Sequence, residues 1–235
     1  SDSGNTDNIT GLNISYNDFA SSNAAAYTGI DLGDDFNTNA ITLTDNDMAT
    51  PIATGIKLAS GTATITKSDI TSAGPDGIGI HLTGGGDHII GADGNTSVKN
   101  VFKLLTTAIK HDANLHLKVY SNDIGTAGNG NSVGILSTTN ANTNALTTKG
   151  NTFRATPIGI DIDGDVDLTS NGDTISEATT AAIDLNNAAA TADIDGLTSN
   201  NSNAIGVKLT LNATVAIDGS TFNSNAGDKG VFVDT

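Results

Sequence analysis

A short pattern of alternating apolar and polar residues returns along the whole chain. Its clearest copies read Gly-Ile-x-Leu or a close variant and occupy residues 29–32, 55–58, 79–82, 159–162 and 206–209. Four looser copies begin at Ala108, Gly134, Ala182 and Gly230. The second residues of successive copies lie 23 to 29 positions apart. A repeat of this length is typical of stacked architectures.

The spacing inside each copy predicts a strand. Ile30 and Leu32 flank Asp31, so the two apolar side chains share one face and Asp31 points to the other. A strand this short cannot bury its apolar face alone. Nine copies stacked about 4.8 Å apart bury it against one another.

A second column of apolar residues lies between these copies: Phe19, Met48, Ile70, Phe102, Ile124, Phe153, Ile175, Leu197 and Phe222. Two positions before each stands a small hydrogen-bonding residue, namely Asn17, Asn46, Ser68, Asn100, Asn122, Asn151, Asp173, Asp195 and Ser220. Such residues tolerate sharp bends and bond neighbouring backbone groups. We therefore expect a recurrent corner, with Asn17, Asn46, Asn100, Asn122 and Asn151 stacked as a hydrogen-bonded ladder.

Alternating residues before each corner supply a third strand, as in residues 12–14, 41–43, 63–65, 115–117, 166–168, 192–194 and 215–217. Three short strands per repeat predict a triangular coil. Residues 84–97 and 138–144 fall between markers, and we expect them to form outward loops. No stretch has the caps and periodicity of an α-helix.

The succession of Gly-Ile-x-Leu, an Ile or Leu strand and Asn-x-Ile/Phe resembles the repeat of right-handed parallel β-helices of the pectin-lyase-like superfamily. The resemblance covers essentially all of residues 1–235. It implies a single all-β domain, a right-handed single-stranded parallel β-helix of about nine coils with three short strands per coil. That superfamily contains polysaccharide lyases, glycoside hydrolases, phage tailspikes, adhesin passengers and non-enzymatic surface proteins, so fold alone does not select a function.

The composition limits which classes of molecule are expected to bind this chain. Ten basic residues against 26 acidic ones give a formal net charge of −16, which repels phosphate backbones, so nucleic acid is not expected as a partner. No apolar run approaches the roughly 18 residues of a membrane span, so no membrane insertion is expected. The absence of cysteine excludes disulfides. Acidic, Asn/Thr/Gly-rich chains of this kind are common among bacterial surface proteins, which favours a secreted, cell-surface location.

The middle residue of each Gly-Ile copy points outward. The resulting outward column is Asp31, Lys57, His81, Lys110, Leu136, Asp161, Asp184, Lys208 and Phe232. Substrate clefts of the resembled superfamily often lie on this face or its edge. Opposite charges at successive positions favour simple cross-strand pairing on a solvated sheet. The alternative is a glycan-binding face formed by Asp31, Lys57, His81, Lys110, Asp161, Asp184 and Lys208.

Catalytic motifs of the superfamily are incomplete. A polysaccharide lyase needs a basic residue and often calcium, but Arg154 is the one arginine and no basic cluster is present. The polygalacturonase-like branch carries Asn-Thr-Asp, Asp-Asp, Gly-His-Gly and Arg-Ile-Lys. Residues 5–7 and 34–35 match the first two motifs. The last two have no counterpart, because His81 lies in Gly-Ile-His-Leu and Arg154 is followed by Ala155. We therefore expect no enzymatic activity.

Alternating aspartates between residues 161 and 167 resemble an oxygen-ligand calcium loop. Val166 replaces the glycine that such loops place sixth, and no bidentate glutamate stands at the far end of the loop. We expect no cofactor, with calcium at Asp163, Asp165 and Asp167 as the alternative. The histidines other than His81, at positions 88, 111 and 116, are expected on the surface or in loops.

These observations predict an extracellular structural β-solenoid that is a segment of an adhesin, a stalk or a self-stacking filament. Its expected partners are neighbouring β-helix modules or copies of itself end to end, because the tips of a solenoid carry unpaired strand edges. The chain closes on the strand-like residues 230–233. The alternatives are a carbohydrate-active enzyme, either a glycoside hydrolase or a polysaccharide lyase, and a non-catalytic glycan-binding β-helix.

Overall fold

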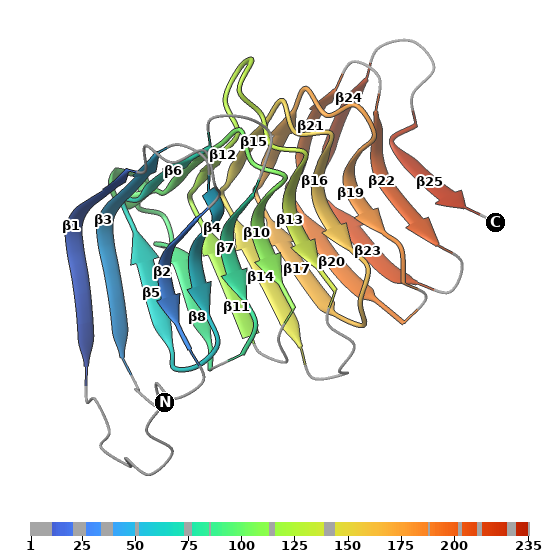
Figure 1. The fold of residues 1–235 in the computed structure, drawn as a ribbon. Coiled ribbons are helices and arrows are strands. Elements are labelled where there is room, and N and C mark those ends of the chain that lie inside the picture. Colours follow the sequence, from blue (N-terminus) through green and yellow to red (C-terminus); the bar gives the residue numbers. More distant parts are fainter. Residues whose placement is uncertain are drawn as a thin grey trace.

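The computed structural model describes residues 11–20, 27–33, 40–49, 52–72, 77–84, 86–112, 116–138, 144–187, 189–201, 204–210, 213–224 and 229–234. These residues form an all-β parallel solenoid (Figure 1). The helical element among them is a single 3₁₀ turn at Thr96–Val98. The predicted fold class is therefore confirmed.

The Gly-Ile copies form a nine-stranded parallel sheet, the Gly-Ile sheet. Ile30 lies beside Ile56, and Ile56 lies beside Ile80, so like residues stack in register. The strands are β2 (Tyr27–Leu32), β4 (Ile52–Leu58), β7 (Ile78–Leu82), β10 (Thr107–His111), β13 (Val133–Ser137), β16 (Ile158–Ile162), β19 (Ala181–Leu185), β22 (Ile205–Thr210) and β25 (Val231–Asp234).

A second, 16-stranded sheet has two arms that meet at the asparagine corner. The strands β1 (Leu12–Ala20) and β3 (Ile41–Ala49) run through the corner. The arm before the corner contains β5 (Ala63–Thr66), β8 (His88–Gly91), β11 (His116–Tyr120), β14 (Ala145–Lys149), β17 (Asp167–Asn171), β20 (Thr191–Asp195) and β23 (Thr214–Asp218). The arm after it contains β6 (Asp69–Thr71), β9 (Val101–Lys103), β12 (Asp123–Ile124), β15 (Thr152–Arg154), β18 (Thr174–Ser176), β21 (Thr198–Asn201) and β24 (Thr221–Ser224).

The solenoid makes about seven turns, slightly fewer than the predicted nine coils. Seven successive sets of three strands run from β5 to β25, whereas in the two N-terminal repeats one long strand replaces two. The prediction of an outward loop over residues 84–97 was wrong for β8, which continues the sheet between β5 and β11. His88 and Gly91 interrupt the alternation of apolar and polar residues, so the sequence pattern did not indicate a strand there.

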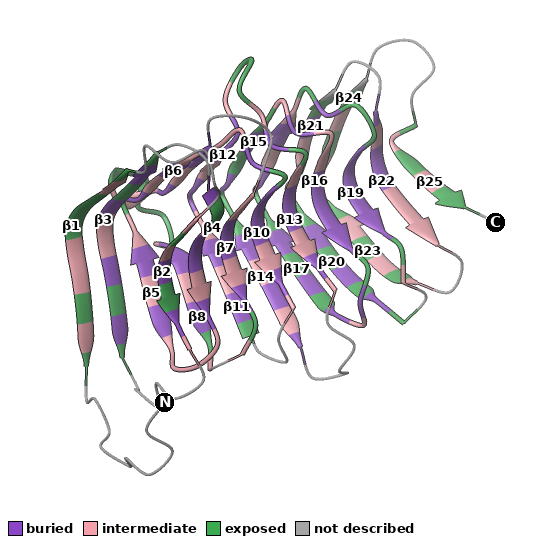
Figure 2. Cartoon of the chain, viewed as in Figure 1, coloured by how far each residue is buried: buried purple, intermediate pink, exposed green. Residues whose placement is uncertain are grey.

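The core consists of the inward columns of the stacked strands, drawn in purple along the interior of the coils in Figure 2. The isoleucines at the second position of the Gly-Ile copies, from Ile56 to Ile183, are fully buried, as are Phe102 and Phe153 under the opposite arm. Because every inward side chain packs on the coils before and after it, burial depends on neighbouring coils being present.

At most corners the chain turns through a residue with left-handed backbone, whose φ lies between 54° and 63°. These residues are Tyr16, Asp45, Lys67, Ser121, Gly150, Gly172, Gly196 and Gly219. This conformation costs a non-glycine residue about 1–2 kcal/mol. The residue that follows each of them lies at the ladder position, where every side chain except that of Leu197 is able to hydrogen-bond to a neighbouring coil.

The asparagine ladder is directional. The side-chain oxygen of Asn122 accepts hydrogen bonds from Asn100 N at 3.1 Å and Asn100 Nδ2 at 2.9 Å, both in the preceding coil. Its amide nitrogen donates to Asn151 Oδ1 in the following coil and to the Ile90 carbonyl in the preceding one. Asn17 likewise donates to Asn46 Oδ1 at 2.9 Å. Each buried asparagine thus fastens three coils together.

The ladder ends at Asp173. Its carboxylate accepts hydrogen bonds from Asn151 N, Asn151 Nδ2, Thr148 Oγ1 and Ser170 Oγ, at 2.6 to 2.9 Å. The next coil has Leu197 at the ladder position, because Thr198 pairs with Thr174. The prediction of Leu197 in the apolar column was therefore wrong, and Ser199 occupies that place beside Ile175.

The glycines of the Gly-Ile copies are required by close packing between coils. A Cβ at Gly134 would lie 2.4 Å from the Gly159 carbonyl oxygen and 2.7 Å from Phe153 Cδ1. Ala182 replaces glycine where the neighbouring column residue is the small Ser199, whereas Gly159 in the previous coil faces Ile175.

The ladder predicts a large cost for Asn122→Ala. The change removes the acceptor for two buried donors of Asn100, so we expect the free energy of unfolding to fall by about 2–4 kcal/mol in urea denaturation. The matched control is Asn223→Ala, because Asn223 also bonds an asparagine of the preceding coil, Asn200 at 2.8 Å, but is exposed. Its cost should stay within about 0.5 kcal/mol, and equal losses in the two variants would contradict the role given to the ladder.

Because Gly134 lies so close to the Gly159 carbonyl oxygen and to Phe153, we expect Gly134→Ala to destabilise the fold by about 1–3 kcal/mol through overpacking. Gly33→Ala is the control, since nothing lies within 4 Å of a Cβ at Gly33. Thermal unfolding of the two variants measures the difference. A Gly134→Ala variant as stable as the control would show that the coils separate easily.

Candidate functional site

The outward column lies in register along the Gly-Ile sheet. Cα pairing joins Asp31 to Lys57, Lys57 to His81, and His81 to Lys110. It continues through Leu136, Asp161, Asp184, Lys208 and Phe232. The sheet therefore brings together all seven residues of the candidate glycan face, in two polar groups that Leu136 separates.

The first polar group is centred on Asp112, directly after β10. Its Oδ2 lies 2.7 Å from His81 Nε2 and 2.7 Å from Lys110 Nζ, and its Oδ1 accepts from Thr138 Oγ1. Burial alone would raise the pKa of Asp112, but the hydrogen bonds from Lys110, Thr138 and His81 outweigh it and hold the pKa below the usual value. Asp112 therefore binds two members of the column, His81 and Lys110, although the sequence pattern did not indicate it.

The second polar group, which we call the Asp161 cluster, comprises Asp161, Asp163, Asp184, Asn186 and Lys208. Asn186 Nδ2 donates to Asp161 Oδ1 and to Asp163 Oδ1, both at 2.9 Å. Lys208 Nζ lies 3.2 Å from Asp184 Oδ2. Asp161 and Asp184 are only 8% and 3% exposed, and among the residues that the structure describes Asp184 Oδ1 has no hydrogen-bond partner. Two carboxyl groups are thus held side by side, largely away from water.

Burial and like charge change the protonation of this cluster. Desolvation, followed by the charges of Asp163 and Asp184, raises the pKa of Asp161 to about 7. Desolvation also raises the pKa of Asp184, against the opposing effect of Lys208. A carboxyl group that retains its proton near neutral pH is able to act as a general acid. Its small exposed fraction, however, leaves little room for a substrate atom.

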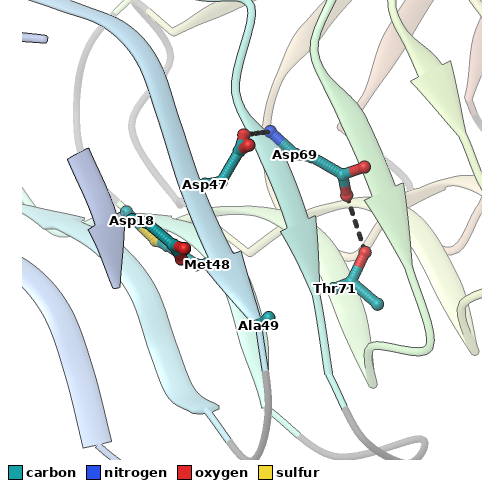
Figure 3. Close-up of a pocket in the computed structure, with 6 residues that line it drawn as sticks. All are labelled: Asp18, Asp47, Met48, Ala49, Asp69 and Thr71. Atoms are coloured by element: carbon teal, nitrogen blue, oxygen red, sulfur yellow. Dashed lines mark hydrogen bonds between the residues drawn. The ribbon is translucent and has the colours of Figure 1, made fainter. Parts of the chain in front are cut away.

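A depression with a volume of about 310 Å³ lies on the other sheet, over β1, β3 and β6 (Figure 3). Asp18, Asp47 and Asp69 line it together with Met48, Ala49 and Thr71. Asp69 N donates to Asp47 Oδ1 at 3.0 Å, and Thr71 Oγ1 donates to Asp69 Oδ1 at 2.7 Å. This surface is acidic, so it repels the uronate groups of an acidic polysaccharide.

The structure does not bring Asp163, Asp165 and Asp167 together as a calcium site. Asp163 accepts from Asn186, and Asp167 accepts from Thr191 of the following coil. Within the described ranges, no three His, Asp or Glu side chains are grouped so that they could hold a metal ion. Strand alternation and separate partners explain why the spacing in sequence does not produce a common ligand set.

The remaining candidate residues are dispersed. Arg154 pairs with Glu177 of the next coil, with a distance of 3.0 Å from Nε to Oε1. Residues 5–7 and 34–35, which match two of the polygalacturonase-like sequence motifs, lie outside the described residues. The surface prediction for His88 and His111 was wrong, because both side chains are fully buried in the inward columns. The position of His111, directly after Ala108-Ile109-Lys110 and equivalent to Leu82, was the available signal.

Buried His88 is held by local bonds. Its Nδ1 accepts from Ala63 N at 3.1 Å, and its Nε2 lies 3.3 Å from the Gly84 carbonyl oxygen. Desolvation lowers its pKa, so the imidazole stays neutral at physiological pH. This residue therefore fills a position in the core and joins adjacent coils.

Comparisons with protein-family models, with curated proteins and with solved structures found no match. In the part of the chain that the structure describes, no helix is long and apolar enough to cross a membrane.

The raised pKa of Asp161 predicts a pH-dependent stability. Because the folded pKa of about 7 exceeds the ordinary value of 3.8 for an aspartate, the native state holds the proton more tightly, and this contribution to stability is lost as pH rises from about 4 to 7. Asp161→Asn should therefore raise the free energy of unfolding at pH 8, by about 2–4 kcal/mol, and leave it unchanged at pH 4.

The control for this experiment is Asp193→Asn, which removes an exposed carboxylate from β20. Urea titrations at both pH values give the comparison. An Asp161→Asn effect of equal size at pH 4 and pH 8 would contradict the predicted protonation.

Proposed function

We propose that this chain is a structural segment of an extracellular β-solenoid, such as a stalk, an adhesin or a filament, and that it acts without catalysis. The observation that carries the proposal is the pairing of the outward column. Lys57 pairs with Asp31, His81 with Asp112 and Lys208 with Asp184, each across neighbouring coils, while Lys110 pairs with Asp112 of its own coil. Charged side chains that are already paired in this way are not available to bind a substrate.

The uniform stack supports the same role. Nine strands of the Gly-Ile sheet pair in parallel without interruption from β2 to β25, which makes a stiff body about 40 Å long. The composition and the repeat's resemblance to the pectin-lyase-like superfamily favour its non-enzymatic, cell-surface branch. In such a protein, function resides in the length, the loops and the two ends.

Carbohydrate hydrolysis at the Asp161 cluster is the second candidate. Two carboxyl groups on adjacent strands, one of them with a pKa of about 7, are the pair that glycoside hydrolysis uses. Binding of Asp184 by Lys208 and of Asp161 by Asn186 opposes this role, because both carboxyl groups already have partners. Non-catalytic glycan binding along the outward column would face the same competition.

A polysaccharide screen separates these candidates. Neutral and acidic polysaccharides are incubated with the chain, and products are read as reducing ends and as absorbance of unsaturated sugars. We expect neither signal and no retention on the polysaccharides. Turnover that Asp184→Asn abolishes, while Asp193→Asn leaves it intact and both variants remain folded, would replace the structural proposal with the enzymatic one.

A further inference from the structure

The two ends of the described solenoid carry side chains of the inward columns that are only partly covered. At the C-terminal end, Val231 and Val233 are 47% and 44% exposed, whereas Val207 in the preceding coil is fully buried. Val215, Ile217 and Phe222 of the same end are partly buried against the core. At the N-terminal end the partly buried residues are Leu12, Ile14 and Phe19.

The two sets match position by position. Following the pairing from coil to coil, Val215 corresponds to Leu12, Ile217 to Ile14, and Phe222 to Phe19. In the Gly-Ile sheet, Val231 and Val233 correspond to Ile30 and Leu32. An N-terminal coil placed over a C-terminal coil would therefore continue every apolar column with a residue of similar character.

Hydrogen bonding at the ladder position also continues across such a junction. Inside the solenoid, a backbone N–H donates to the ladder side chain of the next coil, as Leu197 N does to Ser220 Oγ at 3.1 Å. Within the described residues, neither Ser220 N–H nor the side-chain oxygen of Asn17 makes a hydrogen bond. Stacking places this donor against this acceptor.

Charge favours the same contact. Phe232 occupies the outward column directly below the place that Asp31 of a stacked copy would take, and Lys229 Nζ lies 3.7 Å from the centre of the Phe232 ring. The cation would lie beside the incoming Asp31. At the corner, Ser15 would face Asp218 and Asp18 would face Thr221, so no carboxylates oppose each other there.

We propose that the C-terminal face, formed by Val231, Val233, Phe222 and Ser220, binds the N-terminal face of a second copy of this chain head to tail. The contact is heterologous, so it extends into an open filament and does not close into a symmetric dimer. Two C-terminal faces would bring Ser220 donors together without an acceptor. This interface rests on the structural role proposed above and gives that role a partner.

The test compares two substitutions that add the same charge. Val231→Lys introduces a cation into the junction, and Thr169→Lys introduces one on the exposed outer face of β17, away from both ends. Sedimentation velocity at rising concentration should show assembly of the parent chain and of Thr169→Lys. Val231→Lys should raise the concentration needed for assembly by about tenfold or more.

Mixing two blocked chains tests the polarity. Leu12→Lys blocks the N-terminal face and Val231→Lys blocks the C-terminal face. At a concentration where the parent chain just assembles, each variant alone should remain monomeric, while the mixture forms dimers and no longer species. Electron micrographs of the parent chain should show rods whose lengths rise in steps of about 43 Å, nine strand spacings. Val233→Lys replaces Val231→Lys if circular dichroism shows that the latter is unfolded.

Three results would overturn the proposal: a parent chain that is monomeric at every concentration, a Val231→Lys variant that assembles as readily as Thr169→Lys, or a single blocked chain that dimerises alone. A folded, inactive monomer would remove the interface and leave the structural role standing. Polysaccharide turnover would remove the structural role whatever the state of assembly.

Discussion

Parallel pairing of each coil with the next, in register and at one strand spacing, is the interaction on which the rest of this structure depends. It sets Ile30, Ile56 and Ile80 in one column and fixes Asp31, Lys57 and His81 in another. No coil has a core of its own, because each inward side chain between the two ends is covered by coils on both sides. Core, corner and surface are therefore three results of one stacking rule.

The same rule decides where polar groups enter the core. A buried polar side chain needs a partner, and in a solenoid the nearest partner lies one coil away in the same column. His111 Nδ1 accordingly lies 3.1 Å from Ser137 Oγ of the next coil, whereas Thr148 and Ser170, which lie side by side, both donate to Asp173 at the corner. The outward column follows the same logic, since Asp184 meets Lys208 in the next coil. Polar residues in these columns therefore tend to pair between adjacent coils. In the Asp161 cluster, two successive coils carry an aspartate, Asp161 and Asp184, and only one lysine, Lys208, lies beside them.

Sequence periodicity predicted the fold because the repeat period and the strand period are both visible in single residues such as Ile30 and Leu32. It missed β8, where His88 occupies an apolar position, and it placed Leu197 in the wrong column because no asparagine marked that corner. The outward column could be listed from the sequence, but Asp112 and Asn186, which lie just outside the copies, could not. Their roles depend on the path of the chain after each strand, which periodicity does not describe.

The most direct test of the stacking rule is a set of distances along one outward column. The chain lacks cysteine, so spin labels can be placed in pairs at Thr42 and Thr169, Thr42 and Asp193, and Thr42 and Ala216, which are exposed positions in successive register. Pulsed electron paramagnetic resonance should give separations near 24, 29 and 34 Å, rising by about 4.8 Å for each coil. Separations that do not rise evenly with coil number would contradict the account.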